Sequence, residues 1–360
     1  MHDRSALGPA DVADDVLTGM VADLLGHDAA GVEVLESHAV PVDYDLPAIT
    51  TASRSWVSGT ARTPGGDQSF RMFVKHVQCW SRSPEFRSVP EDFREVAASS
   101  VPWRTEPLVY RSDLGDRLPD GLRMPRALGV FDLDALSSSL WLEDVRHPAV
   151  AWDLDRYTRA ARLLGRLAAS ERVRPLADVG AFTWSIWQYV HGRVAVDVLP
   201  RLPSLTGLPP DLHARLLAAA ERVPTVTEEL VSLPRLTSHG DACPNNLLAG
   251  GDPGSFVLID YGFWLPNPLA FDLGQLVAGE WQLGRRHTDP LPVVDEACVA
   301  AYTAGLAQEG LTLSVADVRR AHALQLFLFV GLSTALDDDH AADRAELVAF
   351  SLDLLEATDP

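Results

Sequence analysis

The amino-acid sequence predicts an α+β fold with two lobes, because strand-like and helix-like patterns occupy separate stretches of the chain. Between residues 49 and 145, apolar segments with strand-like alternation are separated by turn sequences such as TPGGDQ at residues 63–68. From about residue 150, apolar residues recur mainly at helical spacing. We therefore expect an N-terminal domain at residues 1–145 with a small antiparallel sheet, and a helical C-terminal domain at residues 146–360.

The N-terminal domain is expected to begin with a helix over residues 9–25, where Pro9 suits the first turn. A further helix is expected at PWRTEPLVYRSDL, which contains Glu106. The segments predicted as strands are residues 49–62, 69–77, 124–131 and 138–145.

The C-terminal domain is expected to consist of amphipathic helices, and the segments with this pattern are residues 155–171, 210–223, 295–310 and 341–357. The most apolar run, ALQLFLFVGL at residues 323–332, is too short to span a bilayer and is expected to be a buried core helix.

The composition excludes several classes of protein. The formal net charge is −20, whereas nucleic-acid binding needs clustered cations, so we expect no nucleic-acid partner. The cysteines at positions 79, 243 and 298 are too few for a disulfide framework. The N-terminus also lacks the basic and apolar pattern of a signal peptide. We expect a cytoplasmic protein, monomeric or homodimeric, without a membrane segment.

One β-like segment interrupts the helical half of the chain. The short apolar runs NNLL and SFVLID flank AGGDPG, which is strong turn chemistry, and we expect them to form a hairpin. Because the open ends of a hairpin lie together, Asn246 and Asp260 should be neighbours, with Asp241 in the preceding loop. Two carboxylates and an amide oxygen form a site that suits Mg²⁺ held together with phosphate oxygens.

These residues carry a resemblance to a known family. His239-Gly240-Asp241 followed by Asn246, and then Asp260-Tyr261-Gly262, resemble the catalytic loop and metal-binding segment of the protein kinase-like fold. Glycine after the histidine, and tyrosine between aspartate and glycine, resemble the aminoglycoside phosphotransferase and choline kinase branch. PLAFDLGQL at residues 268–276 does so too, and the resemblance extends from about residue 40 to 310.

The resemblance implies roles for the residues of the second half. Asp241 would orient or accept the proton of a substrate hydroxyl that attacks the γ-phosphate of ATP, with GTP as an alternative nucleotide. Asn246 and Asp260 would hold Mg²⁺ on the nucleotide phosphates. His239 would support the catalytic loop, and Asp272 would brace it; helix capping is an alternative role for Asp272.

The resemblance also implies a nucleotide site in the first half. Lys75, the only lysine in the chain, would contact the α- and β-phosphates and pair with a glutamate on a helix. Glu106 is the expected partner, with Glu91 and Glu95 as alternatives. Backbone groups from Glu143 to Val145 would bind the edge of the adenine.

The phosphate-covering loop departs from the family pattern. We expect this loop at TTASRSW, residues 50–56, which contains no glycine before Gly59. Ser53 and Ser55 are expected to bind phosphate through hydroxyl and backbone donors, and Arg54 could reach phosphate as well.

The expected function is an ATP-dependent, Mg²⁺-dependent small-molecule O-phosphotransferase. The alternative is a kinase-fold nucleotide-binding or regulatory module without catalysis, and a metal-dependent hydrolase is a third reading. The acceptor would be a hydroxyl compound, for which a positive charge is one option. Candidate partners for such a charge are the carboxylates of Asp153, Asp155 and Glu280.

Overall fold

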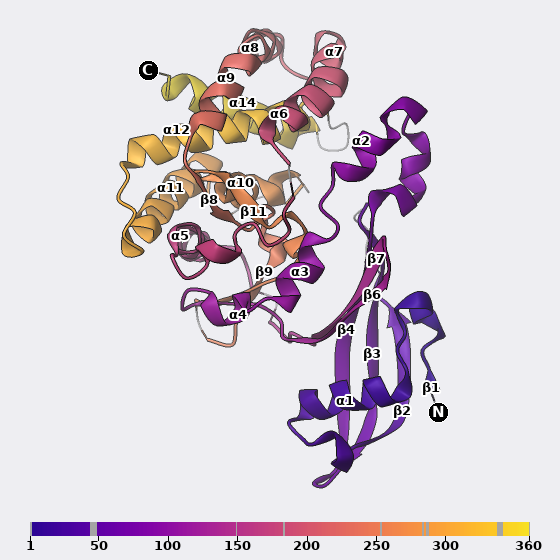
Figure 1. The fold of residues 1–360 in the computed structure, drawn as a ribbon. Helices are drawn as coiled ribbons and strands as arrows, with labels where there is room; N and C mark the ends of the chain where they lie inside the picture. The colour runs from indigo at the N-terminus through magenta and orange to yellow at the C-terminus, as the bar shows by residue number, and fades with distance from the viewer. Residues whose placement is uncertain are drawn as a thin grey trace. The chain divides into compact units, whose positions relative to one another are not determined.

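The computed structural model describes residues 2–43, 49–148, 150–182, 184–252, 254–282, 284–285, 288–336 and 341–359. The chain divides into two compact units. The N-terminal unit comprises Met1–Asp116 and Met124–Arg146, and the C-terminal unit comprises Arg117–Arg123 and His147–Pro360. The N-terminal unit is built on a mixed sheet and the C-terminal unit is mainly helical, so the α+β prediction is confirmed (Figure 1).

The described part of the N-terminal unit forms a six-stranded sheet in the order β1-β2-β3-β4-β7-β6. The strands are β1 His2–Asp3, β2 Glu33–Pro41, β3 Thr51–Thr63, β4 Gly66–Gln78, β6 Ala127–Asp134 and β7 Ser137–Glu143. β1 runs parallel to β2, and the other neighbours are antiparallel. The helices of the first half are α1 Asp14–Leu25, α2 Arg94–Ser99, α3 Thr105–Arg111 and α4 Leu114–Arg117.

The expected loop at residues 50–56 is wrong, because β3 begins at Thr51 and pairs with β4 over its whole length. The connection between β2 and β3 is instead residues 42–50, of which 44–48 lie outside the described residues. The strand predicted over residues 49–62 is confirmed by β3, and the loop expected within the same stretch is not.

The helix expected over residues 9–25 begins later, at Asp14. The Arg4 guanidinium donates to the Asp11 carboxylate at 2.8 Å and to the Val12 carbonyl at 3.0 Å. These bonds stabilise an extended connection before the helix, and Asp11 has the extended φ and ψ values of −68° and 156°.

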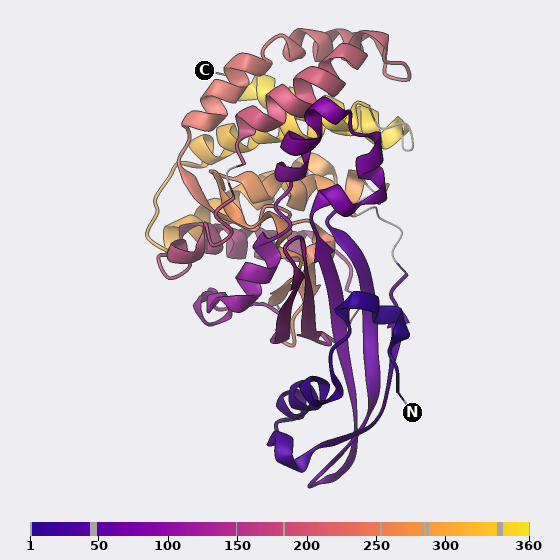
Figure 2. The same ribbon diagram turned by 45° about the vertical axis from the view of Figure 1, so that its right-hand side comes forward.

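One face of the sheet packs against α1. Buried residues of α1, including Leu17 and Val21, share a core with Val57, Met72 and Val74 of the sheet. Figure 1 shows α1 crossing the long strands of the sheet, and Figure 2 shows it on one side of them. We call this side of the sheet the α1 face and the opposite side the Lys75 face.

The C-terminal unit is a helical assembly whose core includes residues of α8, α9, α12 and α14. Its helices are α5 Leu154–Ala169, α6 Ile186–Tyr189, α7 Leu199–Arg201, α8 Pro210–Ala220, α9 Val223–Ser232, α10 Phe271–Gln282, α11 Leu291–Gln308, α12 Val315–Leu326, α13 Leu332–Thr334 and α14 Ala341–Ala357. α5 and α11 cross closely, because a Cβ atom at Gly165 would lie 2.2 Å from the Tyr302 carbonyl oxygen.

The run at residues 323–332 is a buried helical segment, as expected, with a π-helical turn at Phe327–Gly331 between α12 and α13. No helix in the described part of the chain is long and apolar enough to cross a membrane.

Short strands interrupt the helices where the hairpin was expected. β9 Leu247–Ala249 pairs antiparallel with β10 Phe256–Leu258, which confirms the hairpin, although Pro253 of its turn lies outside the described residues. β10 also pairs with β5 Leu122–Arg123. β8 Arg235–Ser238 pairs with β11 Leu265–Pro268. The loops after β8 and β10 are the ones that carry the predicted catalytic and metal-binding residues.

Candidate active site

The loop after β8 is braced by a buried carboxylate. The backbone amides of His239 and Gly240 donate to the two oxygens of Asp272 at 2.9 and 2.8 Å. Gly240 has a φ of 81°, and a Cβ atom there would lie 2.0 Å from the carbonyl oxygen of Phe263. Only glycine fits this position, and Asp272 fixes the course of the loop that leads to Asp241.

His239 is buried and is held in one tautomer. Its Nε2–H donates to the carbonyl of Ile259 at 3.0 Å, and its ring packs against Tyr261 with a centroid separation of 5.2 Å. Burial lowers the pKa of His239 to about 4, so the ring is neutral at neutral pH. This geometry is typical of a group that supports the loop.

The pKa of Asp272 is raised, whereas that of His239 is lowered. Burial raises its pKa to about 6, although the hydrogen bonds from the amides of Gly240 and His239 act to lower it. The carboxylate is therefore ionised at neutral pH, which is the form that accepts two amide hydrogen bonds. It lies in the first turn of α10, yet it accepts hydrogen bonds from the loop after β8, which favours bracing of that loop over helix capping.

Asp241 and Asn246 lie together at the end of the loop. The Nδ2 group of Asn246 donates to the carbonyl of Asp241 at 2.9 Å and to its Oδ2 at 3.0 Å. The amide of Ile259, next to Asp260, donates to the carbonyl of Asn246 at 3.1 Å. The hairpin thus brings the segment that carries Asp260 to the residue that carries the amide side chain.

Asp260 has a left-handed backbone, with φ of 63° and ψ of 68°. Such a conformation is uncommon for a residue with a side chain and is found at functional sites. Burial raises the pKa of the Cys243 thiol to about 12, and the nearby charges of Asp241 and Asp260 add to the increase. A thiol with a raised pKa is a poor nucleophile.

Lys75 and Glu106 form a buried ion pair in the N-terminal unit. The Lys75 Nζ lies 2.7 Å from Oε2 of Glu106, and their side chains are 6% and 4% exposed. Glu106 is in the first turn of α3. The alternatives Glu91 and Glu95 are exposed at the surface. The structure thus pairs Lys75 with the expected glutamate, while the contact of Lys75 with phosphate stays a prediction.

The structure does not bring Ser53 and Ser55 to Lys75. Ser55 pairs with Val74 and Ser53 with His76, whereas Lys75 pairs with Arg54. Directly opposed residues of antiparallel strands share a face, so both serine side chains lie on the α1 face. Ser55 is only 2% exposed.

The segment predicted to bind adenine follows β7. Glu143 is the last residue of β7, and its amide donates to the carbonyl of Arg126 at 3.0 Å. Between Glu143 and Val145, the Asp144 carboxylate lies 3.6 Å from Nη1 of Arg71. The binding of a nucleotide base to this segment stays a prediction.

Two of the three carboxylates considered for a cationic substrate have other contacts. Asp153 caps α5 by accepting from the amide of Arg156 at 2.8 Å. Glu280 lies 3.5 Å from Nη1 of Arg285, which also donates to Oδ1 of Asn245 at 3.3 Å. Asp155 is exposed. The sequence did not indicate the hydrogen bond that Arg285 makes with Asn245.

The turn at the end of α10 explains the position of Arg285. Gly284 has a φ of 70°, and the amide of Arg285 donates to the carbonyl of Glu280 at 2.9 Å. This is the six-to-one bond of a Schellman motif, which ends α10 and turns the chain back. A glycine shortly after an apolar helical segment is typical of this motif, so Gly284 could have predicted the turn from the sequence.

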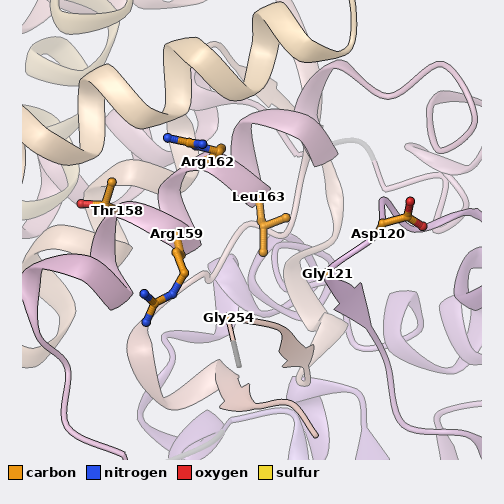
Figure 3. Close-up of a pocket in the computed structure, with 7 residues that line it drawn as sticks. All are labelled: Asp120, Gly121, Thr158, Arg159, Arg162, Leu163 and Gly254. Atoms are coloured by element: carbon orange, nitrogen blue, oxygen red, sulfur yellow. The ribbon is translucent and has the colours of Figure 1, made fainter. Parts of the chain in front are cut away.

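A separate pocket of about 330 Å³ lies on the C-terminal unit beside α5 (Figure 3). Its lining residues are Asp120, Gly121, Thr158, Arg159, Arg162, Leu163 and Gly254. Figure 3 shows the guanidinium groups of Arg159 and Arg162 pointing in different directions. None of the residues predicted for the site lines this pocket.

Comparison with known proteins agrees with the geometry of the braced loop. The model of the phosphotransferase enzyme family matches residues 119–311, which is more than half of the chain. This range contains the loop after β8, the hairpin and Asp272. None of the curated proteins compared with the chain matches it.

Solved structures match nearly the whole chain at low identity. Choline kinase from Cryptosporidium parvum Iowa II has a TM-score of 0.51 and 10% identity, with 96% of each chain covered. Spectinomycin phosphotransferase, solved with ADP and spectinomycin, has a TM-score of 0.48 and 10% identity, with 89% of this chain and 92% of that chain covered. Aminoglycoside phosphotransferase APH(4)-Ia has a TM-score of 0.47 and 11% identity, with 96% and 98% covered.

The shared fold is supported by the choline kinase, since the other two TM-scores are below 0.5. Together with the family match, it confirms the protein kinase-like fold. The chain belongs to the phosphotransferase enzyme family.

Proposed function

We propose that this protein transfers the γ-phosphate of ATP to a hydroxyl group of a small molecule, with Mg²⁺ as the metal. The observation that carries the proposal is the braced loop in which Asn246 donates to the side chain and carbonyl of Asp241. A loop fixed in this way presents one carboxylate in a defined position, which is what transfer to a hydroxyl requires.

Asp241 is the group proposed to receive the hydroxyl proton. It is partly exposed, whereas His239 is fully buried. The Nε2–H of His239 is already donated to Ile259, and its low pKa makes it a weak base. The carboxylate of Asp241 is therefore the better candidate to orient the attacking oxygen.

Asn246 and Asp260 fit a magnesium ion by their donor chemistry. Asn246 uses its Nδ2 group on Asp241, so its Oδ1 is the end suited to a cation, and Asp260 supplies carboxylate oxygens. Bound Mg²⁺ would neutralise charge on the phosphates. No cluster of three or more His, Cys, Asp or Glu side chains suited to a metal occurs in the described ranges. Phosphate oxygens of the nucleotide would share in the coordination of this ion.

The N-terminal domain, residues 1–145, is proposed to bind the nucleotide. Glu106 holds Lys75 within the sheet, and a lysine kept in place by a carboxylate is suited to contact the α- and β-phosphates. The backbone from Glu143 to Val145 is proposed to bind the base. The C-terminal domain, residues 146–360, would hold the acceptor near Asp241.

The acceptor is proposed to be a hydroxylated small molecule. The carboxylate of Glu280 is near Arg285, so a cationic acceptor would compete with this guanidinium for it. A choline kinase shares this fold. Choline is therefore the first acceptor to test.

The experiment is a phosphorylation screen with Mg·ATP and a panel of hydroxylated amines, sugars and antibiotics, read by mass spectrometry of the acceptor. A phosphorylated acceptor that disappears when EDTA replaces Mg²⁺ supports the proposal, and parallel reactions with Mg·GTP define the nucleotide. Tight ATP binding without transfer to any acceptor or to water would favour the non-catalytic nucleotide-binding module.

A further inference from the structure

Arg54 lies directly beside Lys75 on the neighbouring strand. The ladder between β3 and β4 pairs Arg54 with Lys75, and the register continues without a shift from Ser53 to Thr63. Directly opposed residues of an antiparallel pair place their Cβ atoms about 4.5–5.5 Å apart on the same face. The two cationic side chains therefore leave the sheet side by side.

Side-chain contacts confirm which residues share this face. The ring of Trp56, two residues after Arg54, packs against Phe73, two residues before Lys75, with a centroid separation of 5.1 Å. The Arg71 guanidinium lies 3.8 Å from the centroid of the Trp56 ring. Because side chains alternate along a strand, these contacts place Arg54, Trp56, Phe73 and Lys75 on one face.

The residues between them belong to the α1 face. Val57, Met72 and Val74 pack in the core with α1, and Ser55 pairs with Val74. A shift of one residue in the register would exchange the two faces, but a shift occurs only between Thr51 and Ser53. The hydroxyl groups of Ser53 and Ser55 therefore project away from Lys75.

We propose that Arg54 is a second phosphate-binding residue of the nucleotide site, in place of the serine hydroxyls on either side of it. This inference rests on the proposed nucleotide binding and names a further residue of that site. Lys75 is paired with Glu106, so the pair carries little net charge with which to offset a triphosphate. Arg54 brings the N–H donors of a guanidinium to the same face.

The chemistry of arginine suits this position. A guanidinium presents five N–H donors in a planar fork. A contact with another protein group therefore leaves further donors that can bind phosphate. The fork matches two phosphate oxygens at once, and such charge-assisted pairs are stronger than neutral hydrogen bonds. The contact would add to the affinity for the phosphates and leave the affinity for the nucleoside unchanged.

The test is isothermal titration calorimetry of ATP, ADP and adenosine against the full chain and four variants. Arg54→Gln removes the charge, and Arg54→Lys keeps the charge without the fork. The double variant Ser53→Ala with Ser55→Ala removes the hydroxyls. Arg62→Gln is the matched control, because Arg62 is on the same strand and face but pairs with Glu33 at 2.7 Å.

We expect Arg54→Gln to weaken ATP binding about tenfold or more, since a hydrogen bond to a charged group contributes at least about one such factor. ADP binding should weaken as well, adenosine binding should be unchanged, and Arg54→Lys should be intermediate. The double serine variant and Arg62→Gln should bind ATP like the unmodified protein. Circular dichroism and the melting temperature of each variant show whether it is folded.

Two results would overturn the inference, and they differ in what else they affect. If Arg54→Gln and Arg54→Lys, both folded, bind ATP as tightly as the unmodified protein, Arg54 has no phosphate contact and the proposed function stands. If the unmodified protein binds neither ATP nor GTP in the presence of Mg²⁺, the proposed function fails together with the inference.

Discussion

The ion pair between Lys75 and Glu106 should be strongly coupled, because it is almost completely buried. The two side chains are 6% and 4% exposed, and the Nζ and Oε2 atoms are 2.7 Å apart. With an effective dielectric constant of about 20, Coulomb's law gives an attraction of about 6 kcal/mol at this distance. Desolvation offsets part of it, and removal of one partner of a buried pair costs about 3–5 kcal/mol. Glu106→Gln should therefore lower the free energy of unfolding by about 3 kcal/mol.

The assay is a double-mutant cycle with Lys75→Met, Glu106→Gln and the double variant, each unfolded in urea. The matched control is the cycle for Arg62 and Glu33, which are also 2.7 Å apart but 58% and 66% exposed. An exposed pair should show a coupling energy of no more than about 1 kcal/mol. A coupling energy for Lys75 and Glu106 that is no larger than the one for the exposed pair would refute this account of the pair.

Three further predictions concern single positions. Lys75→Arg should keep the fold but lose most phosphoryl transfer, because a planar fork cannot replace a compact ammonium group; unchanged kcat and KM would contradict this. Gly240→Ala should lower both the melting temperature and kcat, because a Cβ atom would lie 2.0 Å from the Phe263 carbonyl oxygen. Burial raises the pKa of Asp272 from 3.8 to about 6, so between these pH values the folded protein binds a proton that the unfolded chain does not. Acidification from pH 7 to pH 4 should therefore stabilise the unmodified protein by about 2 kcal/mol relative to Asp272→Asn in urea unfolding, and an equal response would contradict the shift.

Features that depend on a few neighbouring residues could be predicted from the sequence. The hairpin was predictable because a turn sequence lies between two short apolar runs. The positions of Asp241, Asn246 and Asp260 follow from that hairpin, since it brings its open ends together. The ion pair of Lys75 with Glu106 was expected from the family resemblance together with a cation in an apolar strand.

Features that depend on distant residues could not be predicted. The side of the sheet on which Ser53 and Ser55 lie is decided by the register of β3 against β4, and the sequence of β3 alone does not contain it. The late start of α1 depends on Arg4, whose hydrogen bonds hold the preceding residues extended. The contact of Arg285 with Asn245 joins residues 40 positions apart.

The most direct test of the proposed mechanism is the turnover of Asp241→Asn on an identified acceptor with saturating Mg·ATP. The control is Asp252→Asn, which changes an exposed aspartate in the turn between β9 and β10. We predict that Asp241→Asn lowers kcat at least about 100-fold, the scale of a lost general base, with an unchanged dissociation constant for ATP. Asp252→Asn should have normal activity. Full turnover by Asp241→Asn would contradict the central claim that this carboxylate directs phosphoryl transfer to the hydroxyl.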